Sequence, residues 1–128
     1  MAHIKKFEEL QCWKTSRILV KKVYEITSRG KLERDYDLRS QLRKTAISSM
    51  NNIAEGFSRF SDKEFIRFLD ISIGSTGELK SMIYILEDLD YADTIVLKEL
   101  HQLSDETKAL TLGLLKYLIN KSGVERKN

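Results

Sequence analysis

The side chains best placed for chemistry in this sequence are basic ones that recur at helical spacing. Steps of three and four residues return to the same side of a helix, so such side chains form rows. The rows comprise Lys14, Arg17 and Lys21 in a predicted first helix, Arg39 and Arg43 in a second, and Arg59 at its end. Basic rows can follow phosphates without reading bases, which predicts a nucleic-acid contact. The alternative interpretation is a solvated surface, partly neutralised by Glu8, Glu9 and Glu25.

A different row, poor in lysine, follows the other side of the second predicted helix. It comprises Gln41, Thr45, Ser48, Asn52, Glu55 and Arg59. Amides, hydroxyls and carboxylates find specific hydrogen-bond partners when they are covered, so the row predicts a contact surface. Ser75 and Glu78 of the third predicted helix are expected to join it. We predict contacts between copies of the chain here; the alternative is hydrogen bonding between helices of one chain.

The sequence carries no signature of an enzyme. His3 and His101 are far apart, and no Glu-x-x-His, HExxH, CxxC, Walker or GxGxxG motif occurs. Cys12 has no evident histidine partner for nucleophilic catalysis. We therefore predict no catalytic residue, no metal site and no cofactor.

Four predicted helices must position these rows. They span about 7–27, 37–57, 62–89 and 93–120, in a single domain of residues 1–128. The chain contains no proline, which favours long uninterrupted helices. Asp35 or Asp37 is expected to cap the second helix. Ser61 and Glu64 predict a reciprocal capping box before the third helix, and Asp93 is expected to cap the fourth. Short connections between long helices predict an all-α antiparallel up-down-up-down four-helix bundle.

Apolar spacing predicts the buried side of each helix. Ile18 and Tyr24 are placed on the buried side of the first helix, and Leu110 belongs to a near-strict heptad on the fourth. Gly74 and Gly77 lie inside the third helix, where each costs about 1 kcal/mol relative to alanine. We expect either close approach by a neighbouring helix or a kink to explain them.

Composition narrows the class of protein. The formal net charge is +3, with 13 basic and 7 acidic residues at positions 1–60, and 9 and 12 at positions 61–128. Such asymmetry fits an anionic partner, or opposite faces that meet in an oligomer. No apolar run is long enough for a membrane span, and the single Cys12 cannot form an internal disulfide. We predict a cytoplasmic protein without membrane contact.

Several segments together match a family pattern that covers nearly the whole chain. The first matching positions are Phe7, Leu10 and Trp13, followed by Leu38, Gln41 and Arg43. The central signature matches at Ser48, Asn52, Ile53, Ala54, Glu55, Gly56 and Arg59. The third helix matches at Phe65, Phe68, Leu69, Gly74, Ser75, Glu78 and Leu79. On these residues the chain resembles the four-helix-bundle proteins named after the intervening sequences of 23S ribosomal RNA genes. Lys44 and Thr45 depart from the family's frequent Arg-Ala, but they retain a charge and a small residue.

The resemblance implies a four-helix bundle that assembles into a homo-oligomer, a barrel-shaped pentamer, in a family without established enzymatic activity. Its members are similar to the accessory variability protein of diversity-generating retroelements, a basic pentameric barrel that works with nucleic acid and a reverse transcriptase. By this analogy we expect a non-enzymatic nucleic-acid-binding or accessory factor, directed to RNA or DNA. The alternative function is a scaffold that binds another protein and no nucleic acid.

Overall fold

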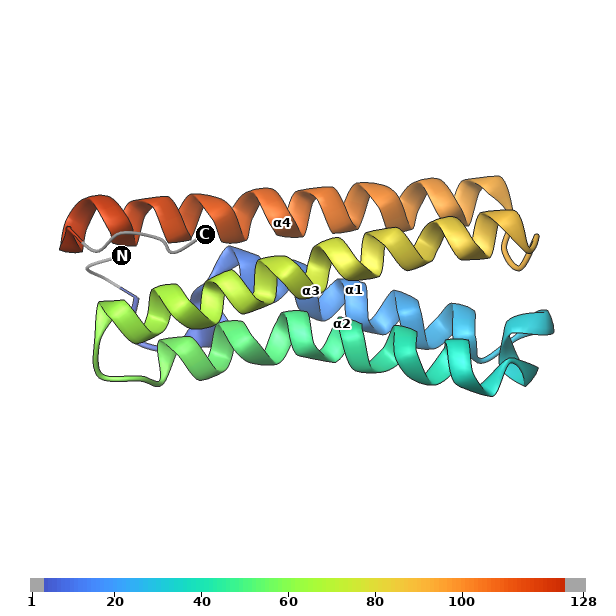
Figure 1. Ribbon diagram of the computed structural model, residues 1–128, viewed down its shortest axis with the longest axis horizontal. Helices are drawn as coiled ribbons and strands as arrows, with labels where there is room; N and C mark the ends of the chain where they lie inside the picture. The colour runs from blue at the N-terminus through green and yellow to red at the C-terminus, as the bar shows by residue number, and fades with distance from the viewer. Residues whose placement is uncertain (1–3, 124–128) are drawn as a thin grey trace.

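Four long helices lie side by side, and consecutive helices run in opposite directions (Figure 1). The computed structural model describes residues 4–123, so His3 lies outside the described residues. The helices are α1 (Gln11–Thr27), α2 (Tyr36–Phe57), α3 (Asp62–Asp88) and α4 (Thr94–Ser122). α1 packs against α2 and α4, and α3 packs against the same two helices. The predicted all-α four-helix bundle is confirmed.

The predicted capping residues begin three of the helices. Asp35 accepts a hydrogen bond from the Leu38 amide at 3.2 Å, and Asp93 caps α4 in the same way. Ser61 Oγ accepts from the Glu64 amide at 3.1 Å, which confirms one half of the predicted capping box. The other half is wrong, because the Glu64 carboxylate pairs with Arg67 at 3.0 Å instead of reaching back to Ser61.

The chain ahead of α1 and α2 differs from the sequence prediction in both places. The expected single helix from residue 7 begins as a 3₁₀ turn, η1 (Phe7–Glu9), and Leu10 is extended before α1 starts. This break lets Leu10 enter the core while Phe7 packs edge-on against Trp13, with ring centroids 5.1 Å apart. The expected charged connector forms a second 3₁₀ turn, η2 (Gly30–Arg34), which buries Leu32 completely.

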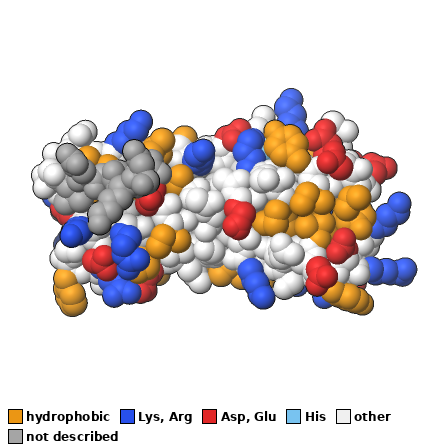
Figure 2. Space-filling model, viewed as in Figure 1, with side chains coloured by type: hydrophobic (Ala, Val, Ile, Leu, Met, Phe, Trp, Pro, Cys, Tyr) orange, Lys and Arg blue, Asp and Glu red, His pale blue; other side chains and the backbone are white. Residues whose placement is uncertain are grey.

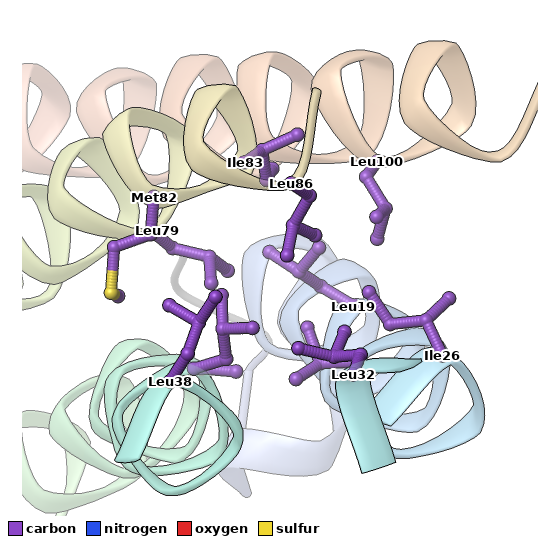
Figure 3. Packing of buried hydrophobic residues seen from close by; sticks show 12 residues of the cluster. Leu19, Ile26, Leu32, Leu38, Leu79, Met82, Ile83, Leu86 and Leu100 are labelled. Carbon is purple, nitrogen blue, oxygen red and sulfur yellow. The ribbon is translucent and has the colours of Figure 1, made fainter. Parts of the chain in front are cut away.

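The core consists of two hydrophobic clusters with buried hydroxyls between them. One cluster contains Leu19, Leu32, Leu38, Leu79, Leu86 and Leu100 (Figure 3). The other contains Leu10, Ile53, Phe65, Leu69, Leu115 and Leu118. The buried hydroxyl residues that separate them along the helices include Ser16, Ser49, Ser72, Thr76, Thr107 and Thr111. Ser72 Oγ donates to the Ser49 carbonyl at 2.6 Å, and Ser49 and Thr76 hydroxyls lie 2.7 Å apart. These bonds tie α2 to α3 and satisfy groups that would otherwise be costly to bury.

Two predicted buried sides are partly wrong. Tyr24 and Ile18 are 39% and 50% exposed, because α1 buries Leu19, Val23 and Ile26 on a side turned away from them. Leu110 is 36% exposed, and Thr111 and Leu115 take its place in the core. A strict heptad drifts around a helix whose period is 3.6 residues, so positions near the middle of α4 rotate out.

The glycines in α3 are not explained inside one chain. α3 is a single uninterrupted helix, and no neighbouring heavy atom lies within 4 Å of a Cβ placed on Gly74 or Gly77. No helix in the described part of the chain therefore makes the expected close approach at these two glycines. The glycine that does permit close approach is Gly56, where a Cβ would lie 2.8 Å from the Phe68 Cβ. Within the described residues, no helix is both long and apolar enough to cross a membrane.

Candidate nucleic-acid interface

The predicted basic rows of α1 and α2 meet along one side of the bundle. On α1, the row of Lys14, Arg17 and Lys21 continues with Tyr24 and Ser28 at the same spacing. Arg43 of α2 contacts both of these last residues, so the two rows adjoin. We call this surface the basic face and define it by Lys14, Arg17, Lys21, Arg39 and Arg43. Salt bridges among the described residues involve none of these five cations.

Arg43 is the most constrained cation on the basic face. Its Nε donates to Thr27 Oγ1 at 2.8 Å, and a terminal nitrogen donates to Ser28 Oγ at 3.1 Å. Its guanidinium lies over the Tyr24 ring, 4.3 Å from the centroid. Hydroxyl partners fix the position of the guanidinium but leave its charge uncompensated. Arg43 therefore presents a positive charge in a defined place at the seam between α1 and α2.

Two further arginines of the basic face also lie over aromatic rings. Arg17 lies 5.6 Å from the centroid of the Trp13 ring, and Arg39 lies 4.9 Å from that of Tyr36. Arg39 also donates to the Glu33 carbonyl at 2.7 Å. Cation–π contacts of this kind occur about once per 70–80 residues, whereas five arginines between residues 4 and 123 make one. Ring stacking of arginine is therefore a marked feature of this chain.

Arg59, the sixth predicted cation, does not belong to this face. It lies at the junction of α2 and α3, over the Phe68 ring at 4.9 Å, and forms an ion pair with Glu55 one turn earlier. Arg67 lies over the same ring at 4.5 Å and pairs with Glu64. The hydrogen bond from Arg67 holds the pKa of Glu64 below its usual range. Charges at this junction are thus compensated locally.

The predicted polar contacts gather on the opposite side of α2. We call this surface, shared by α2 and α3, the polar face and define it by Gln41, Ser48, Asn52, Glu55, Ser75 and Glu78. Ser48 and Ser75 hydroxyls lie 2.8 Å apart, and Asn52 donates to the Ser48 carbonyl at 2.8 Å. Together with the pair between Arg59 and Glu55, these bonds give four of the six side chains a hydrogen-bond partner within the chain. Gln41, Glu55 and Glu78 remain exposed.

Apolar side chains lie exposed beside the polar face. Figure 2 shows this side of the molecule, with mainly uncharged, non-hydrophobic groups at its centre and hydrophobic groups gathered at the right near the C-terminal half of α3. Ile71 and Ile85 of α3 are 42% and 41% exposed, and Leu89, the residue after α3 ends, is 47% exposed. They share one row with Ser75 and Glu78, because successive members lie three, four or seven residues apart, and each of these steps returns to the same side of a helix. Sequence analysis missed this row. The available signal was that apolar residues recur at helical spacing on a side of α3 other than the buried one.

The described residues hold no arrangement typical of an active site. Burial raises the pKa of the Cys12 thiol to about 11, so it is a poor nucleophile. Lys80 Nζ lies 3.2 Å from His101 Nδ1 and 2.9 Å from Asp105, while burial holds the pKa of His101 below its usual value. Within residues 4–123, no three His, Cys, Asp or Glu side chains are grouped so that they could hold a metal ion.

Comparison with known proteins gives a family match and a structural match. The family described as 23S rRNA-intervening sequence protein matches residues 8–113. Among curated proteins, none matches the sequence. The fold is similar to a crystal structure of a protein with unknown function from the S23 ribosomal protein family of Bacteroides thetaiotaomicron, with a TM-score of 0.76. That likeness covers 82% of this chain and 95% of the other at 17% identity, so it supports the fold alone.

Proposed function

Because the chain belongs to the 23S rRNA-intervening sequence protein family, we propose that it is a non-enzymatic, homo-oligomeric RNA-binding or accessory protein. The observation that carries this proposal is the basic face. Its five cations have no carboxylate partner among the described residues, and three of them are arginines held over rings. A polyanion would compensate these charges and release its own counterions.

The polar face supports the oligomeric part of the proposal. It combines exposed amide and carboxylate groups with the exposed side chains of Ile71, Ile85 and Leu89. Gly74 adds a place on α3 where no atom of the same chain fills the space above the backbone. A second copy packed here would cover the apolar row and offset the helix-destabilising glycine. The family resemblance implies five copies in a ring.

We also propose a cytoplasmic location, which the free cysteine supports. Cys12 is a buried free thiol, and disulfides are rare in reducing compartments. This supports the proposal of a cytoplasmic protein.

The test combines light scattering with RNA binding. Light scattering should give about 75 kDa for a pentamer, which is five times the 14.9 kDa of one chain. Fluorescence anisotropy with a labelled RNA should then show affinity that falls steeply between about 50 mM and about 200 mM salt. An intact oligomer that binds no RNA at low salt would contradict the RNA-binding function and favour the protein scaffold. A mass of 14.9 kDa would contradict the oligomer.

A further inference from the structure

We propose that the basic face binds unpaired nucleotides by stacking their bases, in preference to duplex RNA. This inference rests on the proposed RNA binding and adds the class of RNA. It follows from the aromatic rings of Trp13, Tyr24 and Tyr36, each of which lies under one arginine of the face. Phosphate contacts alone would need the cations but not the rings.

The rings are spread along the seam between α1 and α2. Trp13 and Tyr24 are about 16 Å apart along α1 at the standard helical rise, and Tyr36 lies about 10 Å beyond Arg43 along α2. Because Arg43 contacts Tyr24, the three stacks together extend over about 26 Å. A stacked strand with an axial rise of about 3.4 Å per nucleotide would place about eight nucleotides over that length.

Two of the three rings are exposed, whereas Trp13 is half-buried and packs against the core and Phe7. Tyr36 is 67% exposed and Tyr24 is 39% exposed, although both are large aromatic side chains that the core would otherwise take up. Exposed aromatic planes between cations are the arrangement by which proteins hold single strands, because every base has a face that stacks. Bases in a duplex already stack on one another and are closed to side chains of this kind.

The planar guanidinium of Arg43 is held in a fixed position on this surface before any strand binds. Thr27 and Ser28 accept from its Nε and from one terminal nitrogen, and no acceptor among the described residues takes the other terminal nitrogen. That amino group is therefore available to a phosphate or a base edge. Because the guanidinium is already held on Tyr24, little conformational freedom is lost when a strand binds.

The experiment compares two probes and matched tyrosine variants. The probes are a fluorescein-labelled RNA of about 12 nucleotides without self-complementarity and the same strand annealed to its complement. The variants are Tyr24→Leu, Tyr36→Leu and Tyr24→Phe in the full chain. Tyr117→Leu is the control, because Tyr117 is 41% exposed but lies on α4. Light scattering of each variant establishes that assembly is unchanged.

Stacking makes a distinct prediction for each variant. We expect the wild type to prefer the single strand, and Tyr24→Leu and Tyr36→Leu each to lose between about 5-fold and about 150-fold in affinity for it. The log–log salt slope should stay unchanged, because no cation has been removed. Tyr24→Phe keeps a ring and should bind within about 2-fold of the wild type, as should Tyr117→Leu.

Failure of this inference differs from failure of the proposed function. Base stacking would be overturned if the duplex bound as tightly as the single strand or more tightly, and the tyrosine variants bound like Tyr117→Leu. A steep salt slope in the same experiment would still support RNA binding. A tyrosine variant that lowers the salt slope would also overturn base stacking, because the ring would then act only through its arginine. Absence of binding to either probe at low salt would overturn both proposals.

Discussion

The polar side chains on the two sides of α2 have different kinds of partner. The basic face, shared with α1, keeps its cations apart from carboxylates and holds its arginines with hydroxyls and rings. The polar face, shared with α3, carries hydroxyls and amides that bond to one another, such as the Ser48–Ser75 pair at 2.8 Å. The basic face therefore presents uncompensated positive charge, and the polar face presents neutral hydrogen-bonding groups.

The groups that bond an arginine, more than the arginine itself, distinguish the basic face from the α2–α3 junction. Arg43 and Arg59 both lie over aromatic rings, at 4.3 Å and 4.9 Å from the centroids. Arg59 also pairs with Glu55, so its field is largely cancelled, whereas Arg43 is bonded only by neutral oxygens. An arginine paired in this way mainly stabilises its helix junction. An arginine without a carboxylate remains available to a polyanion.

The largest expected effect comes from removing the α1 row of the basic face. The triple variant Lys14→Ala, Arg17→Ala, Lys21→Ala should bind RNA roughly 100-fold to 1000-fold more weakly at about 50 mM salt. Its log–log salt slope should fall by about 2, because each phosphate contact on a single strand contributes about 0.7. The measurement is fluorescence anisotropy across salt concentrations. Truncating Lys98, Lys108 and Lys116 of α4 removes the same charge elsewhere, and an equal loss there would show that net charge alone matters.

The next effect concerns the spacing of the two helices that form the polar face. Gly56→Ala should lower the free energy of unfolding by about 1–3 kcal/mol, because the new Cβ would lie within 3 Å of Phe65 and Phe68. Urea unfolding followed by circular dichroism measures this. Gly113→Ala is the control, since no heavy atom lies within 4 Å of its Cβ position. If both variants unfold at the same urea concentration, the α2–α3 crossing is looser than described.

Local signals were enough to predict the fold. Helix starts depend on short-range capping, and Asp35, Ser61 and Asp93 all cap as expected. The buried side of α2 was also predictable, because Leu38, Leu42, Ala46, Ser49 and Ile53 recur at helical spacing and are all buried. Such features depend on residues within one or two turns of each other.

Features that depend on a second helix were not predictable in the same way. Spacing placed Tyr24 in the core, but α1 turns Val23 and Ile26 inward, so Tyr24 lies at the surface in contact with Arg43 of α2. Gly56 gave no sequence signal that separated it from Gly74, since only the position of Phe68 distinguishes them. In both cases the way one helix packs against its neighbour is decisive.

A smaller effect should separate the two kinds of stacked arginine. Arg17→Ala should weaken RNA binding by about 8-fold at about 50 mM salt, because one uncompensated phosphate contact is lost. Arg59→Ala should change it by less than about 2-fold, because its ion pair with Glu55 already compensates the charge. Both are measured by anisotropy, and Arg67→Ala serves as a second carboxylate-paired control. Equal losses for Arg17→Ala and Arg59→Ala would remove the distinction between the two surfaces.

The smallest expected effect tests whether a second copy covers the polar face near Gly74. Inside one chain a Cβ at Gly74 meets nothing within 4 Å, so Gly74→Ala should raise the stability of the isolated protomer by up to about 1 kcal/mol. Gly113→Ala should do the same. If a copy packs against Gly74, only Gly74→Ala should also weaken assembly, which light scattering over a dilution series would show as a lower mass. Two variants that gain stability and keep the same mass would place Gly74 outside the interface, because a site crowded by a partner cannot accept a methyl group without a cost.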